Sequence, residues 1–315
     1  MSPRPWSGPR TPSRRRMWAI IAIAAFLLID VALVAWALSA SHPDVNAKPG
    51  PIPTFTNRPA TPTASPTPTP PPAPSVAAAP RLLIAVSATE AYRATPGACT
   101  AGDNTAADTV FEKSTDAGAT WQASNLGQYK FHTMLTLSGA SDTQISAVVG
   151  AGANCAIGAY SSFTGGQFWQ EYPNNLASAN YIDPADRSKI HAGGAAQPAP
   201  CPAALQLASG ANSTAVLCAD TVFTRAGDGT WASAPVPGVL ALTASDSGYT
   251  LAVAGVAGCP GVSIQSLSVG GAPTAVGCAA SVTAPAEVTL AQQGQNVWLW
   301  SGDKVAVSTT AGATW

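Results

Sequence analysis

The chain has 315 residues, only 10% of them charged, and a formal net charge of −1. Its abundance of Ala, Gly, Pro, Ser and Thr favours short strands and turns over long amphipathic helices. From Arg81 onward the chain carries eight basic and fourteen acidic residues, a balance of 8 − 14 = −6. This argues against nucleic-acid binding, which requires a basic surface.

Residues 17–38 form the first predicted element, a run of nearly apolar residues that follows five arginines within residues 1–16. A helix of this length, rising about 1.5 Å per residue, spans a hydrocarbon core of about 30 Å. Because basic flanks stay in the cytoplasm, we predict a cytoplasmic tail over 1–16 and a signal-anchor helix over 17–40. The protein would then be a single-pass plasma-membrane protein of bacterial type, with its C-terminal domain extracytoplasmic.

Two alternatives remain open for this segment. The small residues of "WALSA" at 36–40 also suit a cleaved signal peptide, although such peptides have only about 7–15 apolar residues. Asp30, near the middle of the run, is either a contact for a partner helix or a tolerated carboxylate.

Residues 41–80 are predicted to form a stalk. Proline at the density seen over 49–80 prevents helix and sheet formation and favours polyproline II. At about 3.1 Å per residue, residues 49–80 could reach ~100 Å, which would lift a folded domain, 81–315, away from the membrane.

The six cysteines all lie beyond the stalk, where an even number on the oxidising side of a membrane predicts disulfides. Hairpin symmetry pairs Cys201 with Cys218 and Cys259 with Cys278, which leaves Cys99 and Cys155. Metal binding is the alternative, but the chain has no Cys-x-x-Cys and only three histidines. We expect neither a metal nor a cofactor.

A short motif recurs through residues 81–315. It reads Ser-x-Asp-x-Gly-x-x-Trp in "STDAGATW" and begins at residues 114, 162, 224, 266 and 308, with decreasing fidelity in the third and fourth copies. Apolar strand pairs precede each copy, and the long gap before the third (224 − 162 = 62 residues) is attributed to an extra disulfide hairpin. The matching residues are Ser114, Asp116, Gly118, Trp121, Ser162, Gly166, Trp169, Trp231, Ser308, Gly312 and Trp315.

This pattern resembles the Asp-box (BNR) repeat of sialidase-like β-propellers. The resemblance implies that each box is the turn between the third and fourth strands of a four-stranded blade, with a structural role for its Asp, Gly and Trp. A repeat of about 40–50 residues is also typical of propeller blades in general. We therefore predict an all-β fold, a β-propeller of about five four-stranded blades, preceded by one transmembrane helix and a Pro/Thr-rich linker.

The last predicted blade lacks a fourth strand, because the sequence given stops directly after the fifth motif. Propellers often close by borrowing a strand from the other terminus, which hides an open sheet edge. The candidates for this strand are "SVAAAP" at 75–80 and "IPTFT" at 52–56.

The resemblance to sialidases does not extend to their catalytic residues. Those enzymes need three arginines around the substrate carboxylate and an Arg-Ile-Pro signature, whereas this domain has four arginines and no such tripeptide. Glu90, Tyr92 and Arg93 in "TEAYR" are weak enzyme candidates. Asp183 and Asp186, the nearest carboxylate pair, suit a turn better than the paired acids of a glycosidase.

Trp298 and Trp300 share one face of a predicted strand. They would be core residues if packed between blades and a stacking platform for sugars or peptides if exposed. The predicted function is accordingly a non-catalytic binding or scaffold module for an extracytoplasmic protein or glycan. The alternative is a degenerate carbohydrate-active glycoside hydrolase. A third interpretation, supported by the fold alone, is a relationship to photosystem II assembly factors, which contain similar repeats.

Overall fold

The computed structural model describes residues 75–76, 80–100, 102, 108–139, 141–192, 195–282 and 287–315. The chain divides into two compact units, 1–68 and 69–315, and all described residues lie in the second. No helix among them is long and apolar enough to cross a membrane. The predicted tail, anchor helix and most of the stalk lie outside the described residues.

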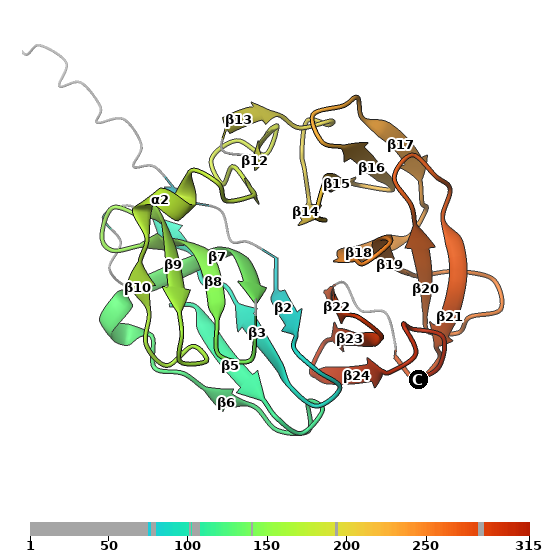
Figure 1. Ribbon diagram of the computed structural model, residues 1–315, viewed down its shortest axis with the longest axis horizontal. Helices are drawn as coiled ribbons and strands as arrows, with labels where there is room; N and C mark the ends of the chain where they lie inside the picture. Colours follow the sequence, from blue (N-terminus) through green and yellow to red (C-terminus); the bar gives the residue numbers. More distant parts are fainter. Residues whose placement is uncertain are drawn as a thin grey trace, which may run out of the picture. The chain divides into compact units, whose positions relative to one another are not determined.

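The second unit is a β-propeller of six blades around a central axis (Figure 1). Each blade is an antiparallel sheet whose first strand lies nearest the axis, and four of the six have four strands. Their strands, in chain order, are as follows. Blade 1 contains β2 (Leu82–Ala85), β3 (Ala91–Thr95), β5 (Val110–Ser114) and β6 (Gln122–Ala123). Blade 2 contains β7 (Phe131–Gly139), β8 (Ile145–Ala151), β9 (Ala156–Ser162) and β10 (Gln170–Glu171). Blade 3 contains β11 (Tyr181–Ile182), β12 (Lys189–Ala192) and β13 (Ala195–Pro198).

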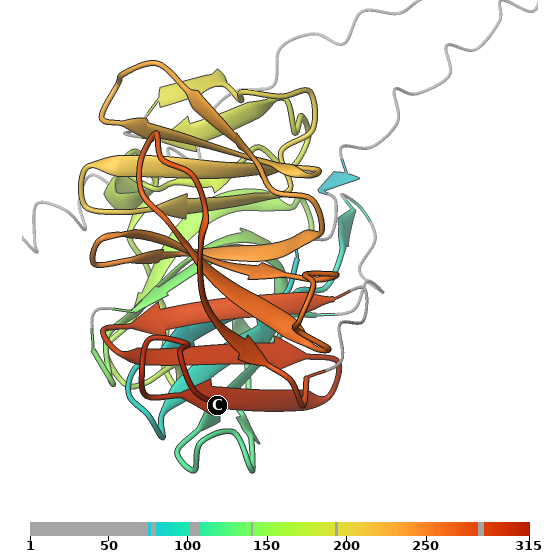
Figure 2. The same ribbon diagram turned by 90° about the vertical axis from the view of Figure 1, so that its right-hand side faces the viewer.

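Blades 4, 5 and 6 form the other half of the ring, which faces the viewer in Figure 2. Blade 4 contains β14 (Gln206–Ser209), β15 (Ser213–Cys218), β16 (Thr221–Ala226) and β17 (Ala232–Pro235). Blade 5 contains β18 (Val239–Ser245), β19 (Gly248–Val253), β20 (Val262–Leu267) and β21 (Thr274–Ala279). Blade 6 contains β22 (Val288–Gln293), β23 (Asn296–Ser301) and β24 (Lys304–Ser308). A 3-10 helix, η1 (Gly127–Tyr129), and a short helix, α2 (Pro173–Leu176), lie in the connections on either side of blade 2.

The prediction of about five blades is wrong, because the long gap before the third motif contains a whole blade. Blade 3 carries no copy of the motif and therefore added nothing to the count. The hairpin between Cys201 and Cys218, interpreted as an insertion, is the first strand pair of blade 4, in which Gln206 pairs with Leu217.

The three disulfides are those predicted: Cys99–Cys155, Cys201–Cys218 and Cys259–Cys278. The reasoning from hairpin symmetry was only approximate, since Cys278 lies opposite Ser263 rather than Cys259 in the β20–β21 register. Cys259 belongs to the β19–β20 connection, so this bond ties a loop to a neighbouring strand. The Cys99–Cys155 bond joins β4 (Cys99–Thr100), a short strand in the connection between β3 and β5, to the β8–β9 turn of blade 2.

The ring closes through side chains between blade 6 and blade 1. The indole Nε1 of Trp298 donates to the carbonyl of Ser87 at 2.8 Å, and Arg81 donates to the carbonyl of Gly302 at 2.8 Å. The predicted closure by "SVAAAP" is wrong, because Ser75–Val76 forms β1 and pairs with β4 (Cys99–Thr100) in a separate two-stranded sheet. The alternative segment, 52–56, lies outside the described residues.

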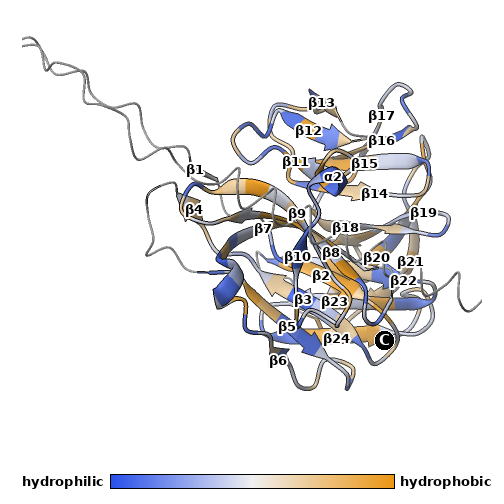
Figure 3. Ribbon diagram, turned by 60° about the vertical axis from the view of Figure 1, so that its left-hand side comes forward, coloured by the Kyte–Doolittle hydropathy of each residue, from blue (hydrophilic) through white to orange (hydrophobic). Residues whose placement is uncertain are grey.

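The core consists of apolar clusters at the interfaces between blades rather than one central mass, as expected for sheets that must each be covered on two faces. Five of the six interfaces contain such a cluster: 1–2, 3–4, 4–5, 5–6 and 6–1. None of these clusters of described residues spans blades 2 and 3. Seen from the side of blade 2, β8 is mainly hydrophobic while the short outer strand β10 is hydrophilic (Figure 3).

Candidate functional site: the cleft between blades 2 and 3

The repeated turns explain how most interfaces are filled. In the turn after β5, the Ser114 hydroxyl accepts a hydrogen bond from Gly118 N at 2.9 Å, and Asp116 Oδ1 accepts one from Thr120 N at 2.9 Å. Trp121 Nε1 then donates to the Gly118 carbonyl at 3.1 Å. These bonds fold the turn and aim its indole sideways, out of its own sheet.

The turns after β9 and β24 repeat this geometry with Thr in place of Asp. Gly166 N donates to Ser162 Oγ at 2.9 Å, and Trp169 Nε1 donates to the Gly166 carbonyl at 3.0 Å. In the last copy, Gly312 N donates to Ser308 Oγ at 3.0 Å and Trp315 Nε1 to the Gly312 carbonyl at 2.9 Å.

Each motif tryptophan packs into the interface with the preceding blade. Trp121 belongs to the 6–1 cluster, Trp169 to the 1–2 cluster, Trp231 to the 3–4 cluster and Trp315 to the 5–6 cluster. Blade 5 has Pro273 at this position, and the 4–5 interface is filled instead by residues that include Tyr249. The described residues of blade 3 contain no such turn, and no motif tryptophan enters the 2–3 interface.

A cavity of about 630 Å³ occupies the centre of the ring and extends into the 2–3 interface. The innermost strand of every blade contributes to its wall. Among the described residues, blade 2 is the one blade whose second and third strands also reach the wall, through residues 146–148 and 159–161. The central cavity therefore continues outward as a cleft over the face of blade 2.

The blade 2 wall of this cleft carries small and hydroxyl-bearing side chains because strand residues alternate between two faces. One face of β8 presents Ile145, Ala147 and Val149 to blade 1. The other presents Ser146 and Val148, and Ser146 Oγ lies 2.9 Å from Ser161 Oγ of β9. Thr136 and Ser138 of β7 extend this wall.

The blade 3 wall is built around Tyr181, which is buried and stacks on His191 at 4.2 Å between ring centroids. Burial raises the pKa of the Tyr181 phenol, and the nearby Asp183 carboxylate raises it further. Asp183 accepts hydrogen bonds from Ala185 N at 2.9 Å and Asp186 N at 3.1 Å, and lies 3.5 Å from His191 Nε2. Asn175, Ser178 and Asn180, from the segment that joins the two blades, also line the cleft.

The charged groups of the cavity wall are mostly engaged with the protein itself. Arg187 donates to the carbonyls of Ala204 and Leu205 at 2.8 and 3.3 Å, and Arg81 pairs with Glu287 at 3.1 Å. Asp183 is the one carboxylate among the described lining residues. A glycosidase mechanism needs two facing carboxylates, and these walls do not supply a pair.

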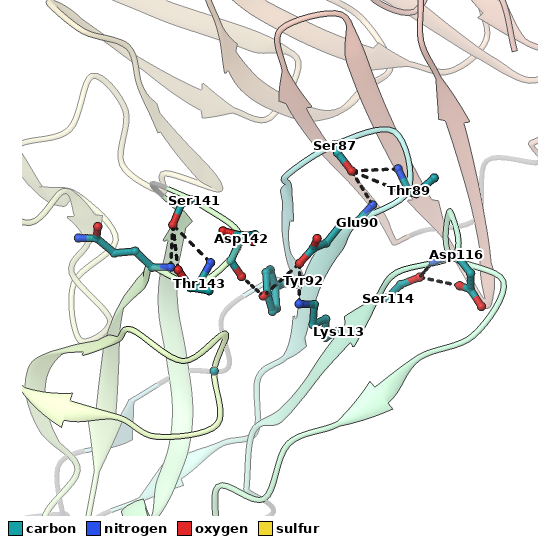
Figure 4. Close-up of polar contacts among 12 residues, drawn as sticks. Ser87, Thr89, Glu90, Tyr92, Lys113, Ser114, Asp116, Ser141, Asp142 and Thr143 are labelled. Atoms are coloured by element: carbon teal, nitrogen blue, oxygen red, sulfur yellow. Dashed lines mark hydrogen bonds and ion pairs between the residues drawn. The ribbon is translucent and has the colours of Figure 1, made fainter.

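The enzyme candidates Glu90, Tyr92 and Arg93 lie outside the cavity, and Figure 4 shows Glu90 and Tyr92 close together beside Lys113. Lys113 Nζ pairs with Glu90 at 2.6 Å, and the Tyr92 hydroxyl donates to the carbonyl of Asp142. Arg93, on the opposite face of β3, pairs with Glu112 at 2.7 Å. Strand alternation thus separates Arg93 from the other two. Tyr92 packs against blade 2 and Arg93 against Trp300 of blade 6, while Glu90 pairs within blade 1.

The remaining candidates are also structural in their surroundings. Trp298 is fully buried and Trp300 is 3% exposed, so neither offers a stacking surface. Asp186 pairs with Lys189 and accepts hydrogen bonds from the hydroxyl and the backbone N–H of Ser188, which together lower its pKa to about 2. No group of His, Cys, Asp and Glu among the described residues could hold a metal ion.

No family model matches the chain. No curated protein matches it either. Among solved structures it is similar to YCF48 bound to D1 peptide (14% identity, 78% of this chain, 82% of that chain, TM-score 0.39). It is also similar to a mutant of Aleuria aurantia lectin in complex with α-methyl-L-fucoside (14% identity, 78% and 100%, TM-score 0.41). A third is the GH74 xyloglucanase from Xanthomonas campestris (13% identity, 74% of this chain, TM-score 0.39), of which the chain spans 45%.

Proposed function

We propose that the protein is a non-catalytic binding module that holds a neutral glycan segment in the cleft between blades 2 and 3. The observation that carries this proposal is the composition of the cleft. Hydroxyl and amide side chains line it, and its cations are already bonded to carbonyl groups or to Glu287. Such walls can exchange hydrogen bonds with sugar hydroxyls without a charged partner.

We place this binding outside the cytoplasm. Three disulfides in one domain favour an oxidising compartment. Attachment to the plasma membrane through residues 17–38, with the N-terminus in the cytoplasm, is proposed from the sequence alone. The hydrogen-bond pattern shared by the turns at 114, 162 and 308 supports the proposal that these repeats are Asp-boxes.

The test blocks the cleft without touching the interfaces that hold the ring. Ser138 is exposed and lines the cleft, whereas Ser233 is exposed on β17, away from it. Ser138→Trp and the matched control Ser233→Trp would be compared with the unmodified full-length protein on an array of neutral oligosaccharides. We expect Ser138→Trp alone to lose binding at least tenfold.

Two results would count against this proposal. Equal binding by Ser138→Trp and Ser233→Trp would show that the glycan binds elsewhere. If no neutral glycan binds while an extracytoplasmic protein is retained in a pull-down that Ser138→Trp abolishes, the ligand of the cleft is a protein and the glycan proposal is wrong.

A further inference from the structure

A second groove lies between blades 1 and 2, at the end of the sheets where the repeated turns are found. It has a volume of about 440 Å³ and runs between the segment 122–128, which follows the blade 1 turn, and the turn at 162–169 of blade 2. It shares no lining residue with the central cavity.

Phe168 is the feature of this groove that packing does not explain. It is 65% exposed, the most exposed of the large hydrophobic side chains described, although it is followed at once by the buried Trp169. Its backbone is fixed, because Phe168 N donates to Thr164 Oγ1 at 2.9 Å. The turn therefore fixes the backbone that carries this ring, while the ring itself stays in solvent and adds little to the buried core.

Amide side chains surround this ring. Gln122, Gln128 and Gln167 are exposed, line the groove and make no side-chain hydrogen bond with any described residue. Each amide has a carbonyl acceptor and two N–H donors. Asn125 also lines the groove, but its carbonyl oxygen already accepts from Gly127 N at 3.0 Å.

The charge of the groove is close to neutral. Lys113 is the one ionisable residue in its lining, and its ammonium group pairs with Glu90 at 2.6 Å. The attraction of an acidic or basic peptide would therefore be small. A rigid apolar ring with flanking amides suits instead a ligand that has a flat C–H face and a rim of hydroxyls.

We propose that this groove, the Phe168 groove, is a second binding site, which takes a neutral pyranose residue stacked on Phe168 and hydrogen-bonded to Gln122, Gln128 and Gln167. It is independent of the cleft between blades 2 and 3. A glycan long enough to reach both sites would bind more tightly than either site allows alone, as for any tethered pair of contacts.

The experiment measures binding of three neutral hexasaccharides, of β-1,4-linked glucose, mannose and N-acetylglucosamine, to the full-length protein by calorimetry. The variants are Phe168→Ala, Phe168→Tyr, Gln167→Ala and the matched control Phe163→Ala. Phe163 belongs to the same turn and is 56% exposed, but it contacts Tyr172 and does not line the groove.

To separate this site from the cleft, every titration is repeated in the Ser138→Trp background. We expect at least one hexasaccharide to bind in that background. Phe168→Ala should weaken this binding tenfold or more and Gln167→Ala three- to tenfold, whereas Phe168→Tyr and Phe163→Ala should change it less than twofold. If no hexasaccharide binds in that background, or if Phe168→Ala and Phe163→Ala have equal effects, the proposal is wrong. Neither outcome affects the cleft, whose own test uses Ser138 and Ser233.

Discussion

The guanidinium of Arg93 lies over the indole of Trp121, with 4.1 Å between its Cζ atom and the ring centroid. The ring of Trp300, from blade 6, lies 4.8 Å from the same atom, and the Glu112 carboxylate pairs with Arg93 at 2.7 Å. Trp121 and Glu112 thus hold this cation within blade 1, and its contact with Trp300 joins the first and last blades.

Replacing Arg93 by Met should destabilise the ring at its closure. Because the change leaves Glu112 largely buried without a partner and removes two cation–π contacts, we expect a loss of about 2–4 kcal/mol. For a domain of this size that lowers Tm by roughly 4–16 °C, measurable by calorimetry. Lys304→Met, at an exposed position of β24, is the control. A Tm change no larger than that of the control would contradict the structural role of Arg93.

The glycine of the repeated turn is predicted to be required for packing as well as for its backbone conformation. Gly258, in the connection between β19 and β20, serves as the control, because its φ of +82° is close to the +85° of Gly118. A Cβ atom on Gly118 would meet Val305 Cγ1 at 2.9 Å, whereas one on Gly258 would meet nothing within 4 Å. Gly258→Ala should cost about 1–2 kcal/mol, and Gly118→Ala about 1–3 kcal/mol more. Equal losses in urea unfolding would show that the blade 6–blade 1 contact is loose.

The disulfides should differ in their contribution according to the loops that they close. Cys99–Cys155 spans 56 residues and Cys201–Cys218 spans 17. Loop entropy gives about 4 kcal/mol for the first and about 3 kcal/mol for the second. Double Cys→Ser variants of each pair, compared by denaturant unfolding, should follow that order. The reverse order would mean that the unfolded chain is already constrained between blades 1 and 2.

Stability should fall at high pH because of buried tyrosines. Burial is the main cause of the raised pKa values of Tyr92, Tyr160, Tyr181 and Tyr249. Because folding raises the pKa of these phenols, the folded state holds their protons more tightly than the unfolded state does. Their contribution to stability is therefore intact below pH ~10 and is lost as pH rises through the folded pKa. Absorbance at 295 nm should show tyrosinate forming above pH 10 together with unfolding. The Tyr181→Phe variant should lose less stability over this range, and an unchanged pH profile would contradict the burial of that phenol.

The 2–3 interface should be the least protected part of the ring. Its described residues form no apolar cluster and no motif tryptophan enters it. We therefore expect β11 and β12, which pack against an apolar cluster on the blade 4 side only, to exchange their amide hydrogens faster than β15 and β19, which have such clusters on both sides. Hydrogen exchange monitored by mass spectrometry measures this. Uniform protection over all four strands would show that the cleft walls are held by other contacts.

Much of this architecture is encoded locally. A serine that caps the turn, a glycine at positive φ and a tryptophan three residues later recur at 114–121, 162–169 and 308–315, and this spacing predicts a repeated blade. Cysteine parity likewise predicts the three bonds. Blade 3 could not be counted in this way, because its sequence contains no copy of the motif. Its strands are held by contacts with neighbouring blades, which a local pattern does not reveal.

The cleft was missed for a related reason. Its walls consist of ordinary strand residues such as Ser146 and Ser161, whose alternation with apolar neighbours is visible in the sequence but is normally a sign of solvent exposure. Only the arrangement of the ring shows that this face of blade 2 lies opposite blade 3, which contributes no motif tryptophan. Conversely, Glu90, Tyr92 and Arg93 are close in sequence, yet side chains along this segment alternate between two faces. Arg93 therefore lies on the face toward blade 6, whereas Glu90 and Tyr92 lie on the face toward blade 2.

The positions of two disulfides give the cleft an unusual mechanical setting. Cys99–Cys155 fastens blade 1 to blade 2 on one side of it, and Cys201–Cys218 fastens the segment after β13 to blade 4 on the other. Neither of these two bonds crosses the gap, so reduction would loosen the blades on either side of the cleft without cutting a bond between its walls.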